Sequence, residues 1–224
     1  MPALLFGSIS TVADTSELQR ESFNEAFAQH GLDWSWDRDD YVEMLGSNGG
    51  KDRVATYAEM RGEDVDADAV HATKSEIFQR KLGDGAVVPR EGVVATVDAA
   101  RQAGYRVALV TTTSPANIAA LGSALRPHLD LDAFDLVVDA SQVEQSKPDK
   151  AAYVYALEQL GEQPEACVAV EDNAGGVLAA SAAGIACVAF PNENTSGFGF
   201  DEAAGRVDAL DFTELTGHLG PKAA

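Results

Sequence analysis

Polar side chains that could bind an anion or a cation follow several apolar segments of the chain. Thr111 comes directly after the run VALV, Glu171 and Asp172 come directly after CVAV, and Lys147 precedes a predicted helix. Hydroxyl and ammonium groups are common partners of phosphate, and carboxylates are common partners of hard cations. Because the carboxyl ends of parallel strands meet at one edge of a sheet, we expect these side chains to converge on a single crevice.

The segment LLFGSISTVADT, residues 4–15, is the loop that should face this crevice. Its apolar start ends abruptly in small and hydroxyl residues, and a helical pattern begins at Thr15. The pattern predicts a first strand, a tight loop and a helix. Residues 7–11 carry no charged side chain, although they should lie where a ligand binds.

Strand and helix patterns alternate from Pro89 onward. Strands are expected at 105–110, 134–139, 167–170 and 186–190, and helices at 91–103, 115–125, 149–160 and 174–183. Repeated units of this length predict an α/β fold in which helices cover both faces of a parallel sheet. Gly104, Gly161 and Gly184 lie where helices should end in a left-handed cap.

Between Thr15 and Val88 the strand patterns disappear and helical patterns replace them. A helical block placed between a first strand and a series of strand-helix units predicts an inserted cap. We therefore expect a core formed by 1–15 and 88–224 and a helical cap formed by 16–87. Trp34 and Trp36 fall in this block, and we expect them to pack inside the cap because large aromatic side chains chiefly contribute buried area.

The composition is that of an ordinary folded protein with a strong acidic excess. Of 224 residues, 46% are hydrophobic and 23% charged, and the formal net charge is −20. This charge disfavours nucleic acids and anionic membranes as partners. Cys167 and Cys187 open apolar runs and lack metal-site spacing, so we expect buried thiols. No targeting or membrane-spanning pattern is present, which predicts a cytoplasmic protein.

Three segments of the crevice carry a family resemblance. Thr111 in VTTTSPAN, Lys147 and Pro148 in SKPDKAAY, and EDNAGGVLAASAAG at 171–184 resemble the haloacid dehalogenase-like (HAD) superfamily. The pieces FNEAF, GLDWSWDRDDY and GGKDR resemble the branch that contains β-phosphoglucomutase and CbbY-type sugar-bisphosphate phosphatases. The resemblance implies a Rossmann-like parallel-sheet core with an inserted helical cap.

The first motif of that superfamily resembles FDxDGT, whose first aspartate attacks phosphorus and whose second protonates the leaving oxygen. Here Gly7 stands at the nucleophile position, Ile9 at the acid/base position, and Ser10 replaces the glycine. Neither Gly nor Ile can perform covalent or proton-transfer chemistry. Ser8 is an alternative nucleophile, but side chains alternate along a strand, so we expect Ser8 to point away if residue 7 points into the site.

The resemblance also implies a Mg²⁺ site and a phosphate site. The carbonyl of Ile9 and the carboxylates of Asp172 and Glu171 remain as metal ligands, but the nucleophile's carboxylate is missing, which predicts weak or absent Mg²⁺ binding. An anion could be held by Lys147, Thr111 and the backbone N–H groups of residues 7–11.

Two cap residues are candidates for substrate contact by the same resemblance. Gln19 stands where family members carry a histidine, and Lys51 in GGKDR stands in the segment that offers a basic residue to a second phosphate.

Each of these residues also has a purely structural interpretation. Asp172 or Asn173 could cap the following helix, Thr111 could be a β-prone strand end, and Lys147 or Lys51 could be solvated surface charges.

These observations favour a pseudoenzyme of sugar-phosphate phosphatase lineage that binds a small phosphorylated metabolite or a protein partner. The alternative is a working hydrolase that uses an unusual nucleophile, or a water activated by Glu171 or Asp172, on a phosphate held by Lys147. A dehalogenase is a third interpretation, but Gly7 counts against it equally, because that reaction uses the same first aspartate in the family.

Overall fold

A parallel six-stranded sheet forms the centre of the computed structural model, which describes residues 1–45, 49–85 and 87–220. The strand order is β3-β2-β1-β4-β5-β6. The strands are β1 (Ala3–Phe6), β2 (Arg106–Val110), β3 (Leu136–Val138), β4 (Cys167–Glu171), β5 (Ala186–Ala189) and β6 (Gly205–Arg206). Phe6 lies opposite Leu109 of β2 and Val170 of β4, so the next residue, Gly7, reaches the carboxyl edge of the sheet together with Glu171.

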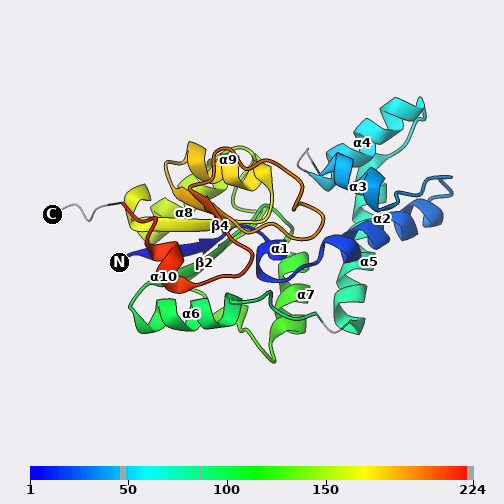
Figure 1. The fold of residues 1–224 in the computed structure, drawn as a ribbon. Helices are drawn as coiled ribbons and strands as arrows, with labels where there is room; N and C mark the ends of the chain where they lie inside the picture. The colour runs from blue at the N-terminus through cyan, green and yellow to red at the C-terminus, as the bar shows by residue number, and fades with distance from the viewer. Residues whose placement is uncertain (46–48, 86, 221–224) are drawn as a thin grey trace.

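Helices cover both faces of the sheet, as predicted (Figure 1). Side chains alternate along β1, so Leu4 and Phe6 join one apolar cluster and Ala3 and Leu5 the other. The first face is covered by α6 (Val93–Gln102), α7 (Pro115–Leu125) and α10 (Phe212–Thr216), and the second by α8 (Ala151–Leu160) and α9 (Ala174–Ala182).

Four helices form the cap: α2 (Ser16–Gln29), α3 (Arg38–Met44), α4 (Gly50–Arg61) and α5 (Ala67–Asp84). Figure 1 shows them gathered beyond the carboxyl edge of the sheet. Trp34 and Trp36 are buried in the aromatic core of the cap, and Trp36 packs edge-on against Phe27 at 4.6 Å between ring centroids. The prediction that both tryptophans pack inside the cap is confirmed. The far end of α5 contributes Phe78 and Leu82 to the core domain, which ties the cap to the sheet.

Most predicted elements agree with the structure to within a few residues. Gly104, Gly161 and Gly184 have φ values of 76°, 63° and 80°, which confirms the predicted left-handed helix ends. Short elements were missed, because periodicity needs a longer window than they offer. The missed elements are α1 (Ile9–Val12), β6, α10 and two 3₁₀ turns, η1 (Leu131–Ala133) and η2 (Pro164–Ala166). The limits of the cap at 16 and 87 stay a prediction.

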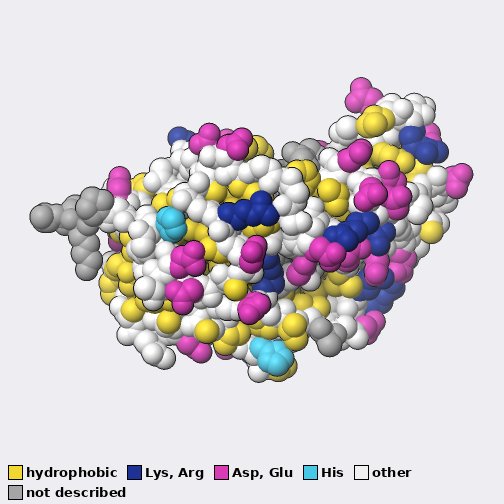
Figure 2. Space-filling model, viewed as in Figure 1, with side chains coloured by type: hydrophobic (Ala, Val, Ile, Leu, Met, Phe, Trp, Pro, Cys, Tyr) yellow, Lys and Arg dark blue, Asp and Glu magenta, His cyan; other side chains and the backbone are white. Residues whose placement is uncertain are grey.

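The surface is rich in acidic side chains, which lie over both lobes of the face in Figure 2. Cys167 and Cys187 are buried in the core beneath it, as expected. Burial raises the pKa of Cys167 to about 12, so this thiol is not ionised near neutral pH. Within the described residues, no helix is both long and apolar enough to span a membrane.

Candidate functional site

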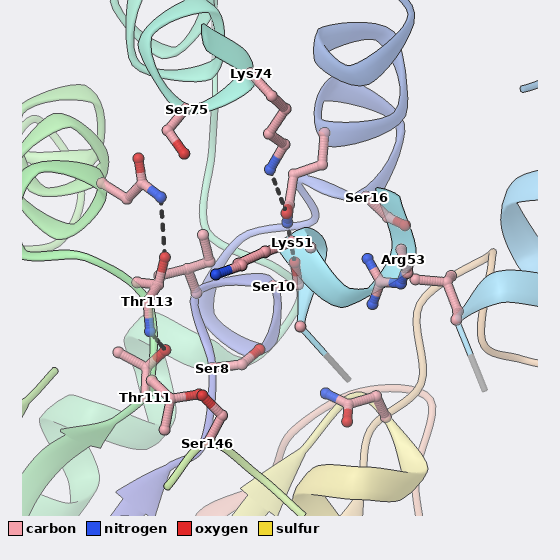
Figure 3. Close-up of a pocket in the computed structure, with 18 of the residues that line it drawn as sticks. Ser8, Ser10, Ser16, Lys51, Arg53, Lys74, Ser75, Thr111, Thr113 and Ser146 are labelled. Carbon is pink, nitrogen blue, oxygen red and sulfur yellow. Dashed lines mark hydrogen bonds between the residues drawn. The ribbon is translucent and has the colours of Figure 1, made fainter. Parts of the chain in front are cut away.

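A cleft of about 490 Å³ lies between the carboxyl edge of the sheet and the cap. In Figure 3, Ser8, Thr111 and Ser146 come from the sheet side, and Lys51 and Lys74 come from the cap helices α4 and α5. Such a position, beyond the ends of parallel strands and under a second lobe, is where α/β proteins bind small ligands. The chemistry available to the protein therefore depends on what these side chains offer.

The carboxylate of Glu171 fills the space beside Gly7. A Cβ atom built at Gly7 would lie under 3.0 Å from the Glu171 carboxyl group and from the Tyr153 hydroxyl, a separation that real Cβ atoms do not show. Gly176, in α9, leaves room for the same carboxylate. The space that a side chain at position 7 would occupy is therefore filled by a neighbouring acid.

A buried network holds Glu171 in this position. Its Oε1 accepts hydrogen bonds from Lys147 Nζ at 2.6 Å and from the Tyr153 hydroxyl at 2.8 Å. Lys147 also donates to the carbonyl oxygens of Gly7 and Val110. Burial raises the pKa of Glu171, and the Lys147 ammonium opposes that shift. The ammonium of Lys147 therefore has one acceptor for each of its three protons. These acceptors belong to the loop after β1, to β2 and to β4, so the lysine links these three segments.

Ser8 faces the cleft rather than away from it. Residues 7 and 8 still point to opposite sides, as alternation predicts, but residue 7 is the one that points away from the cleft, and Ser8 is the N-cap of α1. Ser8 Oγ accepts from the backbone N–H of Thr11 at 3.1 Å and donates to Asp172 Oδ1 at 2.5 Å. Residue 7 points toward the buried Glu171 instead.

Asp172 is surrounded by hydrogen-bond donors from its own protein. In addition to Ser8, Thr11 Oγ1 donates to Oδ1 at 3.2 Å and Asn192 Nδ2 donates to Oδ2 at 3.2 Å. Asn173, rather than Asp172, caps α9 by accepting from Gly176 N at 2.8 Å. Of the two capping alternatives, the structure therefore selects Asn173 and leaves Asp172 facing the cleft.

The donor set does not fit a Mg²⁺ ion in this arrangement. Mg²⁺ requires nearly octahedral oxygen ligands, usually including one or two carboxylates. Here Glu171 is turned toward Lys147, and both oxygens of Asp172 accept hydrogen bonds. Over the described ranges, no group of three or more His, Cys, Asp or Glu residues is placed to hold a metal ion.

The cap side of the cleft carries three basic side chains and one carboxylate, Asp52. Lys51 pairs with Asp68 at 2.7 Å and is half exposed, and Arg53 donates to the carbonyl of Met44 at 3.0 Å. Lys74 is 4% exposed, and its ammonium donates to Gln19 Oε1 at 3.1 Å. Gln19 Nε2 in turn donates to Ser10 Oγ at 3.4 Å, which connects the cap to the segment after β1.

Lys74 and His71 are cleft residues that the sequence analysis missed. Burial lowers the pKa of Lys74 to about 7 and that of His71 to about 4, so His71 is neutral at pH 7. A signal for Lys74 existed: it interrupts the apolar stripe of α5 formed by Val70, Ile77 and Phe78. A charged residue at such a position faces inward, but the sequence alone does not say what it faces.

Arg90 is a third missed residue, and its role is structural. Its guanidinium donates to the carbonyls of Phe190 at 2.7 Å and Pro191 at 2.6 Å, and more weakly to that of Ser10 at 3.3 Å. These bonds fix the loop after β1 against the end of β5. No sequence motif marks this arginine.

The structure brings six of the predicted residues to the cleft: Ser8, Ile9, Gln19, Lys51, Thr111 and Asp172. Lys147 and Glu171 lie buried beside Gly7 and are not among the described residues that line it. The family model of the haloacid dehalogenase-like hydrolases matches residues 2–184. The chain belongs to this hydrolase family.

Several relatives resemble this family member over nearly its whole length. Protein CbbY of Cereibacter sphaeroides is 37% identical over 222 residues, which cover 97% of this chain and 95% of the relative. A crystal structure of a CbbY variant from Rhodobacter sphaeroides, in complex with xylulose-(1,5)bisphosphate, matches with a TM-score of 0.88 at 36% identity and covers 99% of this chain and 100% of that one. Fructose-1-phosphate phosphatase YqaB of Escherichia coli is 32% identical over 189 residues, 83% of this chain and 94% of that protein.

The haloacid dehalogenase-like chain thus keeps the fold of the CbbY branch, and the expectation of that branch is confirmed. The departures from the family motif that the sequence analysis predicts lie in the loop after β1, at Gly7, Ile9 and Ser10, and in the cap at Gln19.

Proposed function

We propose that this protein binds a small phosphorylated metabolite and does not perform aspartyl-phosphate catalysis. The observation that carries the proposal is the pairing of Glu171 with Lys147 in the space beside Gly7. Phosphoryl transfer through a covalent intermediate needs an in-line nucleophile and a proton donor. Gly7 and Ile9 supply neither. The charged neighbours, Glu171 and Lys147, form an ion pair with each other.

The proposal extends to the metal and to the ligand. We infer that Mg²⁺ binds weakly, because both Asp172 oxygens already accept hydrogen bonds. The relatives support a small sugar phosphate as the ligand, since one is crystallised with a pentulose bisphosphate and another is named for a hexose monophosphate. Thr111 lines the cleft and stays our candidate for a ligand contact, whereas Lys147 does not line the cleft and instead holds the loop after β1 through the Gly7 carbonyl.

A working hydrolase is the second candidate, and one contact favours it. Ser8 Oγ lies 2.5 Å from Asp172 Oδ1 and faces the cleft. In that reaction Ser8 Oγ would bond to phosphorus while the bond between phosphorus and the sugar oxygen breaks. The Ser8 proton would pass to Asp172 and from there to the departing sugar oxygen, and water would later hydrolyse the phosphoserine to phosphate and the free hydroxyl. The hydroxyl is also the N-cap of α1, which is the structural explanation for its position.

Phosphate release and ligand binding, measured on the same preparations, test the two candidates. We expect calorimetric titration to detect binding of a sugar phosphate, while the rate of phosphate release stays at the background measured in buffer alone. The matched variants are Ser8→Ala and Asp172→Asn, with Ser141→Ala in an exposed turn as control. Release that both site variants abolish and the control preserves would establish the hydrolase. If no sugar phosphate tested were either bound or hydrolysed, the proposed function would be wrong.

A further inference from the structure

The two sides of the cleft differ in charge. The cap side presents Lys51, Arg53 and Lys74 with one carboxylate, Asp52, whereas the sheet side presents hydroxyl and amide groups around Asp172 and, among the described lining residues, no cation (Figure 3). In a protein with a net charge of −20, a cationic surface facing a cleft is a local feature rather than a general one. An anionic group of a ligand would therefore be attracted to the cap.

Lys74 is the strongest sign of an anion on this side. It is 4% exposed and packs against the rings of Phe23 and Phe78, with Nζ 4.8 Å and 5.0 Å from their centroids. Its polar partner is the neutral Gln19, and in the described part of the chain no carboxylate lies within ion-pair distance of it. A buried ammonium without a counterion is costly, and an anionic ligand would supply the missing charge.

The sheet side cannot offer an equivalent site for a second phosphate. The cation nearest to Gly7 is Lys147, and Glu171 together with the carbonyls of Gly7 and Val110 occupies its ammonium. The ionisable side chain that lines the cleft near the sheet is Asp172, which would repel a phosphate. The carboxylates do not fit a metal ion that could screen this repulsion.

Hydroxyl groups dominate the rest of the sheet side, and they suit a sugar. Thr111, Thr113 and Ser146 line the cleft there. Ser146 Oγ has no hydrogen-bond partner among the residues that the structure describes, so it is available to a ligand hydroxyl. A carboxylate such as Asp172 also accepts hydrogen bonds from sugar hydroxyls.

We propose that the ligand is a sugar or polyol with a single phosphate group, bound without a metal ion, with its phosphate on the cap beside Lys74 and Arg53 and its hydroxyl end against the sheet. The proposal rests on the proposed function and specifies its ligand class. A volume of about 490 Å³ accommodates a ligand of this size. The orientation follows from the charges of this chain, since the position beside Gly7 holds a neutralised ion pair.

Calorimetric titration with matched triose, pentose and hexose ligands tests the proposal. Each sugar is supplied as the monophosphate, the bisphosphate and the free sugar, first with EDTA and then with Mg²⁺. We expect a monophosphate to bind in EDTA, its free sugar to bind far more weakly, and its bisphosphate to bind no more tightly, with Mg²⁺ leaving this order unchanged. Tighter binding of a bisphosphate that requires Mg²⁺ would overturn the single-phosphate, metal-free assignment while leaving metabolite binding intact.

Variants on each side then test the orientation. Lys74→Met should weaken the binding of the monophosphate on the order of tenfold or more, because it removes a desolvated charge that would face the phosphate. Binding of the free sugar, which has no phosphate, should stay unchanged. Lys81→Met on the same helix, where Lys81 pairs with Glu21 at the surface, is the matched control. Ser146→Ala should weaken the binding of the monophosphate and of the free sugar by similar factors. A monophosphate affinity unchanged by Lys74→Met, or lost equally in Lys81→Met, would contradict a phosphate on the cap. Failure of every ligand to bind would instead remove the proposed function itself.

Discussion

The Glu171 carboxylate lies in the volume that a side chain at position 7 would need, and Lys147 neutralises it there. Gly7 and Glu171 therefore behave as one unit. The small residue makes room for the acid, and the acid fills the space that the small residue leaves. Restoring a carboxylate at position 7 requires that Glu171 move.

Gly7→Ala should destabilise the protein by about 1–3 kcal/mol, because the added methyl group overlaps a fixed carboxylate and the Tyr153 hydroxyl. Chemical denaturation measures the change. Gly83→Ala is the matched control: this glycine lies in α5 with nothing within 4 Å of a built Cβ, and we expect a gain of about 0.5–1 kcal/mol. Combining Gly7→Ala with Glu171→Ala should cost less than the sum of the single changes. Strict additivity would mean that the two residues do not share the space.

Lys147→Met should cost about 3–5 kcal/mol at pH 7, because it leaves Glu171 charged, buried and unpaired. Burial already raises the pKa of Glu171, and loss of Lys147 should raise it further. A raised folded-state pKa gives stability that is present at low pH and lost as pH rises through that pKa. The deficit of the variant should therefore shrink toward pH 4. The control is Lys150→Met, at an exposed position, whose stability should follow the parent at every pH. A pH-independent deficit would indicate lost packing rather than an unpaired charge.

Lys74→Met should stabilise the ligand-free protein by roughly 2–4 kcal/mol near pH 7, since the pKa of Lys74 is lowered from 10.5 to about 7 by burial and by Arg53. Between these two pKa values the unfolded chain binds more protons than the folded chain, so the parent gains stability as pH rises from 7 to 10.5. The advantage of the variant should decline over the same range. His71 and Arg53 face this lysine, and His71 is already neutral there. Denaturation curves at pH 7 and pH 10 are the measurement, and a constant advantage would refute the charge explanation.

Mg²⁺ should stabilise the protein by less than about 0.4 kcal/mol at a concentration of about 10 mM, as expected when the dissociation constant exceeds that concentration. Thermal denaturation with Mg²⁺ should be compared with NaCl of equal ionic strength, because a chain of net charge −20 responds to salt in general. A larger, Mg²⁺-specific shift that Asp172→Asn removes would show that Asp172 gives up its hydrogen bonds to bind the metal.

Local patterns in the sequence were sufficient for the framework of this protein. The apolar runs before Gly7, Thr111 and Asp172 predicted strands whose ends meet, because parallel strands share one carboxyl edge. Helical periodicity predicted α7 with both ends correct. The residue types at positions 7 and 9, compared with the motif that the family resemblance implies, predicted that the two aspartates of that motif are missing.

Only the tertiary structure decided what took their place. Alternation along the chain sends residues 7 and 8 to opposite sides, but only the tertiary structure shows that Ser8 faces the cleft and Gly7 faces the buried Glu171. The Glu171 side chain lies beside Gly7 and pairs there with Lys147. Pairing offsets the free-energy cost of burying each charge. Lys74 meets the cleft from α5, a helix remote in sequence from the sheet edge. Sequence periodicity specifies which face of an element is buried, whereas the contacts between remote elements specify which charges must be neutralised there.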